Sequence, residues 1–583
     1  MPPVATFLPI STALTSYDRQ TLSRDLLAAL IVTVMLIPQS LAYALLAGLP
    51  AQVGLYASIV PLVAYAAFGT SRTLSVGPVA VASLMSAAAL GEVARQGSAD
   101  YLLAAATLAT LSGAFLALLG ALRLGFLANF LSHPVISGFI TASGLLIALS
   151  QLKHILGIGA NGDTLPHLFQ SLLANLGSIN LYALLTGAAV IAFLYWARSG
   201  AVRLFERLSF SAHTAGLLVK AAPVVGVIAT IVAAIAFDFD GKQVALVGTI
   251  PAGLPSLHMP VLSWSLVEPL ILPAIMISII GYVESVSVGK TLAAKRRQKI
   301  DMNQELIALG AANFASGLSG AFPVTGGFSR SVVNFDAGAE TQMASVFAAA
   351  GIALASIFLT PFLYYLPKAT LAATIIVAVL SLVDFSILKK TWQFSRSDFL
   401  AVVITIGVTL LFGVEAGVAC GVAASVALLL YRTSRPHIAE VGLVEGTEHF
   451  RNIRRHPVLT VPEILSIRVD ESLLFSNASF LEDRIYADLA ANEQVRHVIL
   501  MCSAINEIDW SALEVLEAVN ARLVEQGMKL HLSEVKGPVM DSLEKCGFLQ
   551  HLSGKIFLSQ YQAFSQIRAE FSDSSAARPA FPA

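Results

Sequence analysis

The chain has 583 residues, of which 56% are hydrophobic and only 13% are charged, with a mean hydropathy of +0.75. Soluble domains carry roughly 25% charged residues, so this composition excludes a soluble protein and predicts an integral membrane protein. The net charge of −1 gives no indication of partners, and the three cysteines have no spacing typical of a metal site or a disulfide.

The first 24 residues are predicted to be a cytosolic segment. Arg19 and Arg24 come just before the first apolar stretch, and no small-residue cleavage site follows a short apolar core. The N-terminus is therefore not expected to carry a cleavable signal.

Apolar stretches long enough to cross a hydrocarbon layer of ~30 Å recur between residues 25 and 431, which we predict to be a transmembrane domain. The tenth stretch is too short to cross alone unless an extended lead-in at 322–327 supplies the rest. The fourteen predicted spans are 25–47, 50–68, 75–91, 100–120, 127–150, 178–197, 216–236, 267–291, 303–320, 328–337, 342–365, 369–384, 398–412 and 414–431.

Two segments, 74–79 and 322–331, are predicted to start helices near the bilayer midplane. Pro78 suits the first position of a helix, and Ser329 can cap the second helix after the Gly326-Gly327 pair. Helices that start inside a membrane direct unsatisfied N–H groups and a positive dipole end at a ligand, and such paired breaks indicate a transporter's substrate site. The sequence therefore predicts an anion site; the alternative is a pair of ordinary loops between buried helices.

Positive charges predict the orientation, because Lys and Arg accumulate in cytoplasmic loops. With fourteen spans, the basic loop residues fall on one side, so both termini are predicted to be cytoplasmic, in a bacterial inner membrane. We interpret these residues as topogenic; they are Arg72, Arg123, Arg198, Arg203, Arg207, the 295–299 cluster, Lys389, Lys390 and Arg396.

After Arg432 the chain becomes charged and mixed in composition. Strand-like runs at 464–469, 497–501 and 529–532 alternate with helix-like stretches, which predicts a small α/β domain over 436–571. Asp509 or Ser511 lies at a predicted helix N-terminus, where Ser511 could accept a regulatory phosphate; the alternative is that Ser511 only caps the helix. Residues 572–583 are predicted to form a disordered tail.

Several motifs closely resemble the SulP (sulfate permease) family of anion transporters. They are PQSLAYA at 38–44, GLYAS at 54–58, FGTSR at 68–72, VESVSVGKTLA at 283–293, DMNQEL at 301–306 and SRS at 329–331. The C-terminal part resembles the family's STAS domain. The resemblance implies a 7+7 inverted repeat of fourteen segments split into a core and a gate domain, assembled as a homodimer.

The resemblance also implies a substrate site between the starts of the third and tenth segments, with side chains from the first and eighth. Gln39 and Tyr43 are four residues apart on one helical face; the alternatives are an interhelical hydrogen bond for Gln39 and a packing role for Tyr43. The implied substrate-binding residues are Gln39, Tyr43, Ser75, Val76, Gly77, Phe328, Ser329 and Arg330.

Glu284 is the implied coupling residue. It lies in an otherwise uncharged stretch, 275–288, where a carboxylate is costly unless it is neutralised or solvated in a cavity. We interpret it as a proton relay or cation ligand; the alternative is a structural salt bridge to Arg330. Arg330 can contact two oxygens of an oxyanion at once, or can instead extend to the cavity mouth.

These features predict a secondary active transporter of sulfate, coupled to protons or sodium and working by alternating access in the lipid bilayer. The alternatives are a bicarbonate or other anion transporter, an exchanger or channel, and a membrane sensor that signals through its STAS domain. A cytosolic regulatory protein is a possible partner of that domain. No enzyme activity, cofactor, metal ion or nucleic-acid partner is expected.

Overall fold

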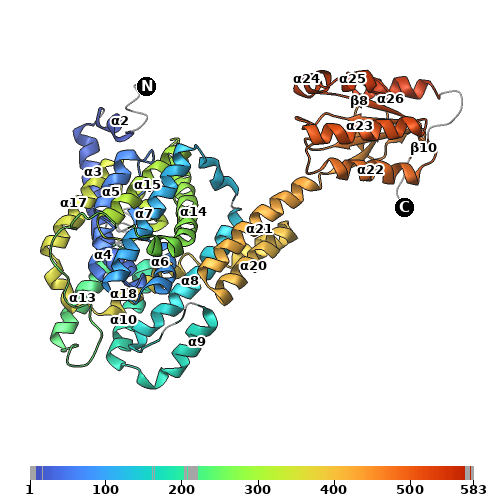
Figure 1. Ribbon diagram of the computed structural model, residues 1–583. Coiled ribbons are helices and arrows are strands. Elements are labelled where there is room, and N and C mark those ends of the chain that lie inside the picture. The colour runs from blue at the N-terminus through green and yellow to red at the C-terminus, as the bar shows by residue number, and fades with distance from the viewer. Residues whose placement is uncertain are drawn as a thin grey trace. The chain divides into compact units, whose positions relative to one another are not determined.

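The computed structural model describes residues 8–571 except 16, 131, 161, 163, 202–206, 208–218, 220 and 261, together with 578–579. The chain divides into two compact units, Met1–Ser425 and Val426–Ala583. The first unit is helical and the second contains a large β-sheet (Figure 1).

The membrane unit consists of helices joined by short connections. Its α-helices are α2 (Ile10–Thr15), α3 (Arg19–Leu46), α4 (Ala51–Tyr56), α5 (Val60–Phe68), α6 (Ala80–Val93), α7 (Ala99–Ala121), α8 (His133–Leu156), α9 (Leu165–Ala174), α10 (Leu181–Trp196), α13 (Ala222–Ala236), α14 (Trp264–Lys295), α15 (Met302–Leu318), α16 (Phe328–Asp336), α17 (Met343–Phe358), α18 (Lys368–Leu380), α19 (Ser386–Phe394), α20 (Arg396–Phe412) and α21 (Val414–Ser434). Within the described residues, this unit also contains the 3-10 helices η1 (Gly125–Phe130), η2 (Leu176–Ser178) and η4 (Thr360–Tyr365) and the π-helical turn η3 (Ala197–Ala201).

Each predicted span overlaps one of these helices or a consecutive pair, and 50–68 corresponds to α4 and α5. Residues 216–218 and 220 of the seventh predicted span lie outside the described part of the chain. Among the described residues, six helices are long and apolar enough to cross a membrane singly, and several other apolar helices are shorter. The helix of the first predicted span, α3, begins at Arg19, before the predicted start, because the Asp18 side chain accepts a hydrogen bond from the Thr21 N–H and caps it.

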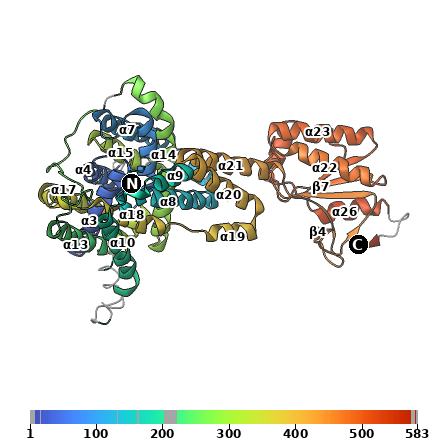
Figure 2. The same ribbon diagram turned by 90° about the horizontal axis from the view of Figure 1, so that it is seen from below.

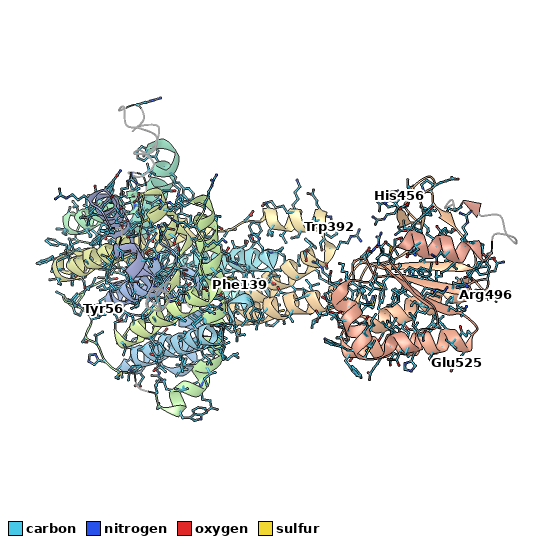
Figure 3. The ribbon with its side chains drawn as sticks, turned by 90° about the horizontal axis from the view of Figure 1, so that it is seen from above. Tyr56, Phe139, Trp392, His456, Arg496 and Glu525 are labelled. Carbon is cyan, nitrogen blue, oxygen red and sulfur yellow. The ribbon has the colours of Figure 1, made fainter. Side chains whose placement is uncertain are left out.

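The helices pack in two main sets. In the first, α7 packs against α14 and α15, and α3 packs against α17; in the second, α8 packs against α18 and α20, and α10 packs against α18. Figures 1 and 2 show α7, α14 and α15 side by side in both views. Figure 3 labels Phe139 of α8, which is buried, and Trp392 of α19, which is 56% exposed.

The second unit is an α/β domain, as predicted. Its strands are β3 (Ile438–Leu443), β4 (Phe450–Asn452), β5 (Leu459–Thr460), β6 (Ile464–Val469), β7 (His497–Met501), β8 (Lys529–Ser533), β9 (Ile556–Phe557) and β10 (Arg578–Pro579). The sheet order is β10-β5-β3-β6-β7-β8-β9, with β6 to β9 parallel. Its helices are α22 (Ala478–Ala491), α23 (Trp510–Glu525), α24 (Gly537–Lys545), α25 (Phe548–His551) and α26 (Gln560–Ala569).

Two apolar clusters lie on the two faces of this sheet. The larger one joins β6, β7 and β8 to α22, α23 and α24, and the smaller one joins β3 and β7 to α26. Of the predicted tail, residues 578–579 form the strand β10, in which Arg578 is opposite Thr460. The remaining tail residues, 572–577 and 580–583, lie outside the described part of the chain.

Two buried histidines of this domain form a hydrogen-bonded pair. His497 Nδ1 and His531 Nε2 are 2.9 Å apart, and His531 Nδ1 accepts a hydrogen bond from the Lys555 N–H at 3.0 Å. Since His531 Nδ1 is an acceptor, Nε2 must carry the proton and donate it to His497. Burial lowers the pKa of His531 to about 4 and also lowers the pKa of His497, so both rings are neutral in the folded domain.

Ser511 is not the cap of α23. The helix begins at Trp510, and the side chain of Asp509 caps it by accepting a hydrogen bond from the Ala512 N–H at 2.8 Å. Asp509 also accepts a hydrogen bond from the Phe475 N–H at 2.7 Å. Ser511 therefore lies in the first turn of α23, with an exposed side chain.

Candidate anion-binding site

A two-stranded antiparallel ribbon forms inside the helical unit. Strand β1 (Val76–Gly77) pairs with β2 (Thr325–Gly326), with Val76 opposite Gly326 and Gly77 opposite Thr325. The extended lead-in predicted before the tenth segment is thus present. Pro78 does not start the third helix as predicted, because pairing keeps the chain extended and α6 starts only at Ala80.

Side chains of α14 and α15 hydrogen-bond the backbone next to and within β2. The Asn313 amide accepts from the Val324 N–H and donates to the Val324 carbonyl, both at 2.9 Å. Ser285, which follows Glu284 on α14, accepts from the Gly326 N–H at 2.8 Å. Irregular backbone is stable at membrane depth only when protein groups satisfy it, so these contacts allow two helices to begin beside the ribbon.

Both helices begin without a side-chain cap. The residue before α6 is Val79 and the residue before α16 is Gly327, and neither helix start receives a side-chain hydrogen bond. Ser329 is therefore not the cap that the sequence predicted; it is the second residue of α16. The first-turn N–H groups of both helices remain available to a ligand, and the helix dipoles favour an anion there.

Both helix starts line one cavity of about 380 Å³. Of the predicted residues, the cavity is lined by Gln39, Tyr43, Glu284, Phe328, Ser329 and Arg330, together with Val79, Ala80 and Val81 at the start of α6. The structure therefore brings together side chains from α3, α14 and α16, which are far apart in the sequence.

Ser75, Val76 and Gly77 do not line this cavity. All three are buried, because they belong to the strand β1 and the residue before it. Gly77 instead lies under the guanidinium of Arg330: a Cβ atom on Gly77 would be only 2.5 Å from Arg330 Nη1. The glycine thus supports a cavity residue from behind, since any side chain there would displace the guanidinium.

The polar side chains of the cavity have free hydrogen-bonding capacity. Arg330 is 2% exposed, and its only hydrogen bond within the described part of the chain is a long one of 3.5 Å to the Thr325 carbonyl. Glu284 and Arg330 line the same cavity but form no ion pair with each other. The predicted alternative of a structural salt bridge between them is therefore not observed in this conformation.

Two buried carboxylates outside the cavity hold its supporting elements in place. Glu305, within the 301–306 motif, accepts hydrogen bonds from the hydroxyls of Tyr65 and Thr70 at 2.7 and 2.6 Å, and from the Thr70 and Ser71 N–H groups. It thereby fixes the segment that leads into β1. We interpret this motif residue as a positioning residue for the ribbon.

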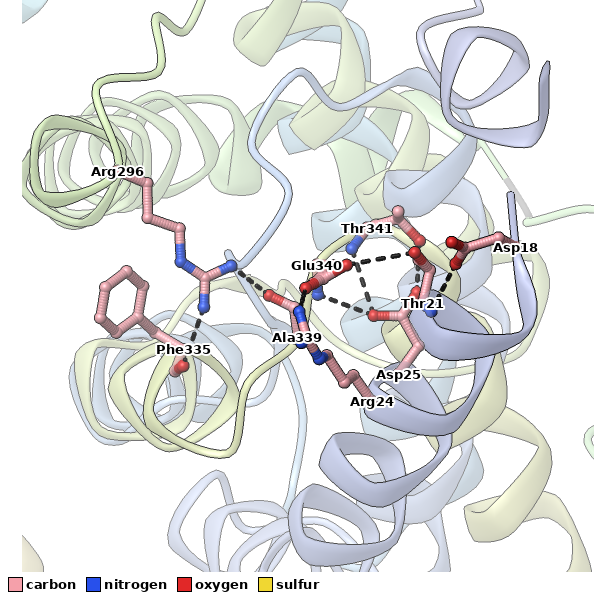
Figure 4. A network of polar contacts seen from close by, with 9 residues as sticks. All are labelled: Asp18, Thr21, Arg24, Asp25, Arg296, Phe335, Ala339, Glu340 and Thr341. Atoms are coloured by element: carbon pink, nitrogen blue, oxygen red, sulfur yellow. Dashed lines mark hydrogen bonds and ion pairs between the residues drawn. The ribbon is translucent and has the colours of Figure 1, made fainter. Parts of the chain in front are cut away.

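The second carboxylate is Asp25, near the start of α3 (Figure 4). It accepts hydrogen bonds from the N–H groups of Glu340 and Thr341 at 2.7 and 3.2 Å, just after α16. Arg24 pairs with Glu340, and Arg296, just after α14, donates to the carbonyls of Phe335 and Ala339. The network connects the ends of α3, α14 and α16, the helices that carry the cavity side chains.

Sequence reasoning missed two parts of the cavity. Arg198, which we interpreted as topogenic, lines it from η3. Val79, Ala80 and Val81 also line it, because the third helix starts later than predicted. The later start of the third helix had a signal in the sequence. β-Branched Val76 and Val79 flank Gly77-Pro78, a pattern that favours an extended segment.

Residues 22–405 match the Sulfate permease family and residues 457–563 match the STAS domain. The chain belongs to the sulfate permease family. It is 34% identical over 563 residues to the chloroplastic sulfate transporter 4.1 of Arabidopsis thaliana, covering 94% of this chain and 81% of the relative. It is 33% identical over 538 residues to a probable sulfate transporter of Mycobacterium tuberculosis, covering 92% and 93% of the two chains.

Among solved structures, this permease resembles the murine Solute Carrier 26 family member A9 anion transporter in its inward-facing state. The TM-score is 0.88 at 25% identity, covering 97% of this chain and 94% of the other. The transmembrane domain of the cyanobacterial bicarbonate transporter BicA shares the fold, with a TM-score of 0.59 at 21% identity over 70% of this chain. The predicted family and fold are confirmed, and the permease is an integral membrane transporter rather than an enzyme.

Proposed function

We propose that this permease transports sulfate across the membrane by alternating access, with a proton as the coupling ion. The observation that carries the proposal is the convergence of two uncapped helix starts and Arg330 on one cavity that also contains Glu284. The curated relatives named as sulfate transporters support the choice of sulfate. Substrate binding is assigned to Gln39, Tyr43, Phe328, Ser329 and Arg330.

The cavity suits a doubly charged oxyanion. Two helix N-termini contribute roughly +0.5 each and Arg330 contributes about +1, so the site approaches +2 when Glu284 is protonated and about +1 when it is ionised. Sulfate is costly to dehydrate, and the first-turn N–H groups, the Gln39 amide and the guanidinium can together replace its water shell. Ser75, Val76 and Gly77 act indirectly, through the ribbon.

Proton coupling follows from the same charge count. Protonation of Glu284 raises the positive charge of the cavity to match a dianion, and release of the anion favours loss of the proton. Glu284 has no ion-pair partner among the described residues, which leaves its carboxyl free to exchange protons with water in the cavity. Sodium remains the alternative coupling ion.

The remaining features of the proposal concern the cellular setting. We assign both termini to the cytoplasmic side of a bacterial inner membrane, from the distribution of basic residues. We assign the permease to a homodimer, with a cytosolic regulatory protein acting on the STAS domain. The exposed Ser511, in the first turn of α23, is the proposed site of a regulatory phosphate.

Uptake of radiolabelled sulfate into liposomes containing the purified permease tests the transport proposal. We expect an inward proton gradient to drive accumulation and a sodium gradient to have no effect. Unlabelled sulfate should compete strongly, whereas bicarbonate and chloride should compete weakly. Stronger competition by bicarbonate than by sulfate would identify bicarbonate as the substrate. Accumulation driven by a sodium gradient would identify sodium as the coupling ion.

A further inference from the structure

A second arginine reaches the cavity from a different set of helices. Arg198 lies in η3, a π-helical turn that directly follows α10, and it lines the same cavity as Arg330. Single π-helical turns are rare and often occur at functional sites. The turn places a cation at a cavity wall whose other lining residues here are Leu194, Ala197, Thr374, Val377 and Ala378.

Most N–H donors of the Arg198 side chain form no hydrogen bond within the described residues. Its Nη2 atom donates to the Val377 carbonyl of α18 at 3.1 Å, the only hydrogen bond that its side chain forms within the described residues. A guanidinium carries five N–H donors, so most of them remain open. Among the residues that the structure describes, Glu284 is the only carboxylate that lines the cavity, and no carboxylate forms an ion pair with Arg198.

The two arginines belong to elements that pack in different sets. Arg330 is on α16, which packs against α3 and α14, whereas η3 packs against α10, and α10 packs against α18. Alternating access moves one such set relative to the other. Two cations on these sets repel each other in an empty cavity, and a dianion between them offsets more of that repulsion than a monovalent anion does.

We propose that Arg198 is a second cationic contact for the transported anion and that it favours doubly charged over singly charged oxyanions. This inference rests on the proposed function. A cavity of about 380 Å³ is large compared with the ~30 Å³ that one water molecule occupies in the liquid, so it has room for an anion together with water. Arg198 holds the anion during entry and release, and Arg330 and the helix starts hold it once it is dehydrated.

A purely structural role would be different. The Val377 carbonyl lies in the last turn of α18, where an arginine stabilises unsatisfied carbonyls and the negative dipole end. That role predicts loss of stability when Arg198 is changed, with no particular effect on anions. Charge selection predicts a change in KM that depends on anion charge and on ionic strength.

The test compares Arg198→Gln, Arg198→Lys and wild-type permease in liposomes, at low and high potassium gluconate. Arg198→Gln should raise the KM for sulfate about tenfold at low ionic strength, with kcat nearly unchanged, and should weaken the salt dependence of KM. Arg198→Lys keeps the charge and should restore most of the affinity. Arg95→Gln, an exposed position outside the cavity, is the matched control.

Several results would overturn the inference. One is an unchanged sulfate KM in Arg198→Gln; another is an equal loss for sulfate and chloride. A fall in thermal stability with unchanged sulfate binding to the purified protein would establish the structural role instead. If the wild-type permease carries a monovalent anion and no sulfate, both the proposed function and the selection of double charge fail, and the KM for that anion in Arg198→Gln decides whether Arg198 contacts it.

Discussion

Two helix starts in the STAS domain differ from the two helix starts at the cavity. In the STAS domain, Asp509 caps α23 and Ser559 caps α26, each accepting a hydrogen bond from a first-turn N–H. In the membrane unit, α6 and α16 begin at Val79 and Gly327 with no such bond, although both starts lie in a cavity. These two STAS helices satisfy a first-turn N–H group with their own capping side chain, whereas the two helices at the cavity leave such groups for a ligand.

The largest expected effect comes from removing the ionisable carboxyl of the cavity, Glu284. Glu284→Gln should abolish sulfate accumulation driven by a proton gradient, because the amide resembles the protonated acid and releases no proton. Exchange of internal for external sulfate should persist, since the neutral side chain still suits a dianion. Glu268→Gln, an exposed position on the same helix, is the control, and full proton-driven accumulation in Glu284→Gln would remove this residue from the coupling mechanism.

Arg330→Ala should weaken sulfate binding by about 10- to 150-fold, the range expected for losing charge-assisted hydrogen bonds. Chloride binding should weaken less, because the loss of one positive charge costs a dianion more than a monovalent anion. Binding of radiolabelled sulfate and chloride to the purified permease measures both effects. Equal losses for the two ions would show that Arg330 supports the ribbon without contacting the anion.

Asp509→Ala should destabilise the start of α23 by about 1–2 kcal/mol, because the Ala512 N–H loses its cap and the Phe475 N–H loses its acceptor. Faster hydrogen exchange in the first turn of α23 would report this loss. Asp509→Asn keeps a capping oxygen and should behave nearly as wild type. Unchanged exchange in Asp509→Ala would mean that solvent satisfies this helix start equally well.

Val79→Thr should lower sulfate affinity about fivefold. It replaces one methyl group by a hydroxyl at the position before α6, where the backbone is extended and suits a cap worth ~1 kcal/mol. The hydroxyl then competes with the anion for the first-turn N–H groups. Val79→Ala makes a smaller side chain without adding a cap, so an equal loss of affinity in both variants would attribute the effect to packing.

The His497–His531 pair makes the stability of the STAS domain depend on pH, but only below neutral pH. The folded domain keeps His531 neutral down to about pH 4, whereas the unfolded chain binds protons below its ordinary pKa of about 6.5. Stability is therefore complete above pH ~6.5 and falls as the pH drops toward 4. Of the neighbouring charges, Lys529 and Lys555 oppose protonation and Glu570, 3.9 Å from His497, favours it.

Hydrogen exchange of the β7 and β8 amides between pH 7.5 and 4.5, corrected for intrinsic rates, measures this loss of stability. His531→Gln should flatten the pH dependence, because the amide can accept from Lys555 and donate to His497 without titrating. His456→Gln, at an exposed position, should leave the dependence unchanged. A pH-independent wild type would show that the pair does not control the stability of the domain.

Repeated crossing of the membrane could be predicted from apolar length, since the hydrocarbon layer imposes a minimum span on a helix, whereas the 7+7 arrangement came from the family resemblance. Which residues line the cavity could not be predicted in the same way. Ser75 and Gly77 were assigned to the site from the resemblance, but pairing between residues about 250 positions apart keeps them in the ribbon and moves the helix start to Ala80. A local pattern contains no information about that partner strand.

Charge was equally ambiguous in the sequence. Arg198 and Arg123 both follow apolar stretches, and the positive-inside pattern gives the same topogenic interpretation for each. Only the packing of α10 against α18 brings Arg198 to the cavity. Likewise, Asp509 and Ser511 are both good capping residues, and the hydrogen bond from Phe475, 34 positions away, fixes Asp509 in that role.

The short helix α16 has a final consequence for affinity. It has only nine residues, fewer than the roughly 12–15 that an isolated helix needs to be stable in water, so its neighbours must impose its shape. The β1–β2 ribbon holds its start, and Asp25 and Arg296 hold the segment at its end. The anion therefore meets a preorganised binding surface, and little of its binding free energy is consumed in ordering the protein.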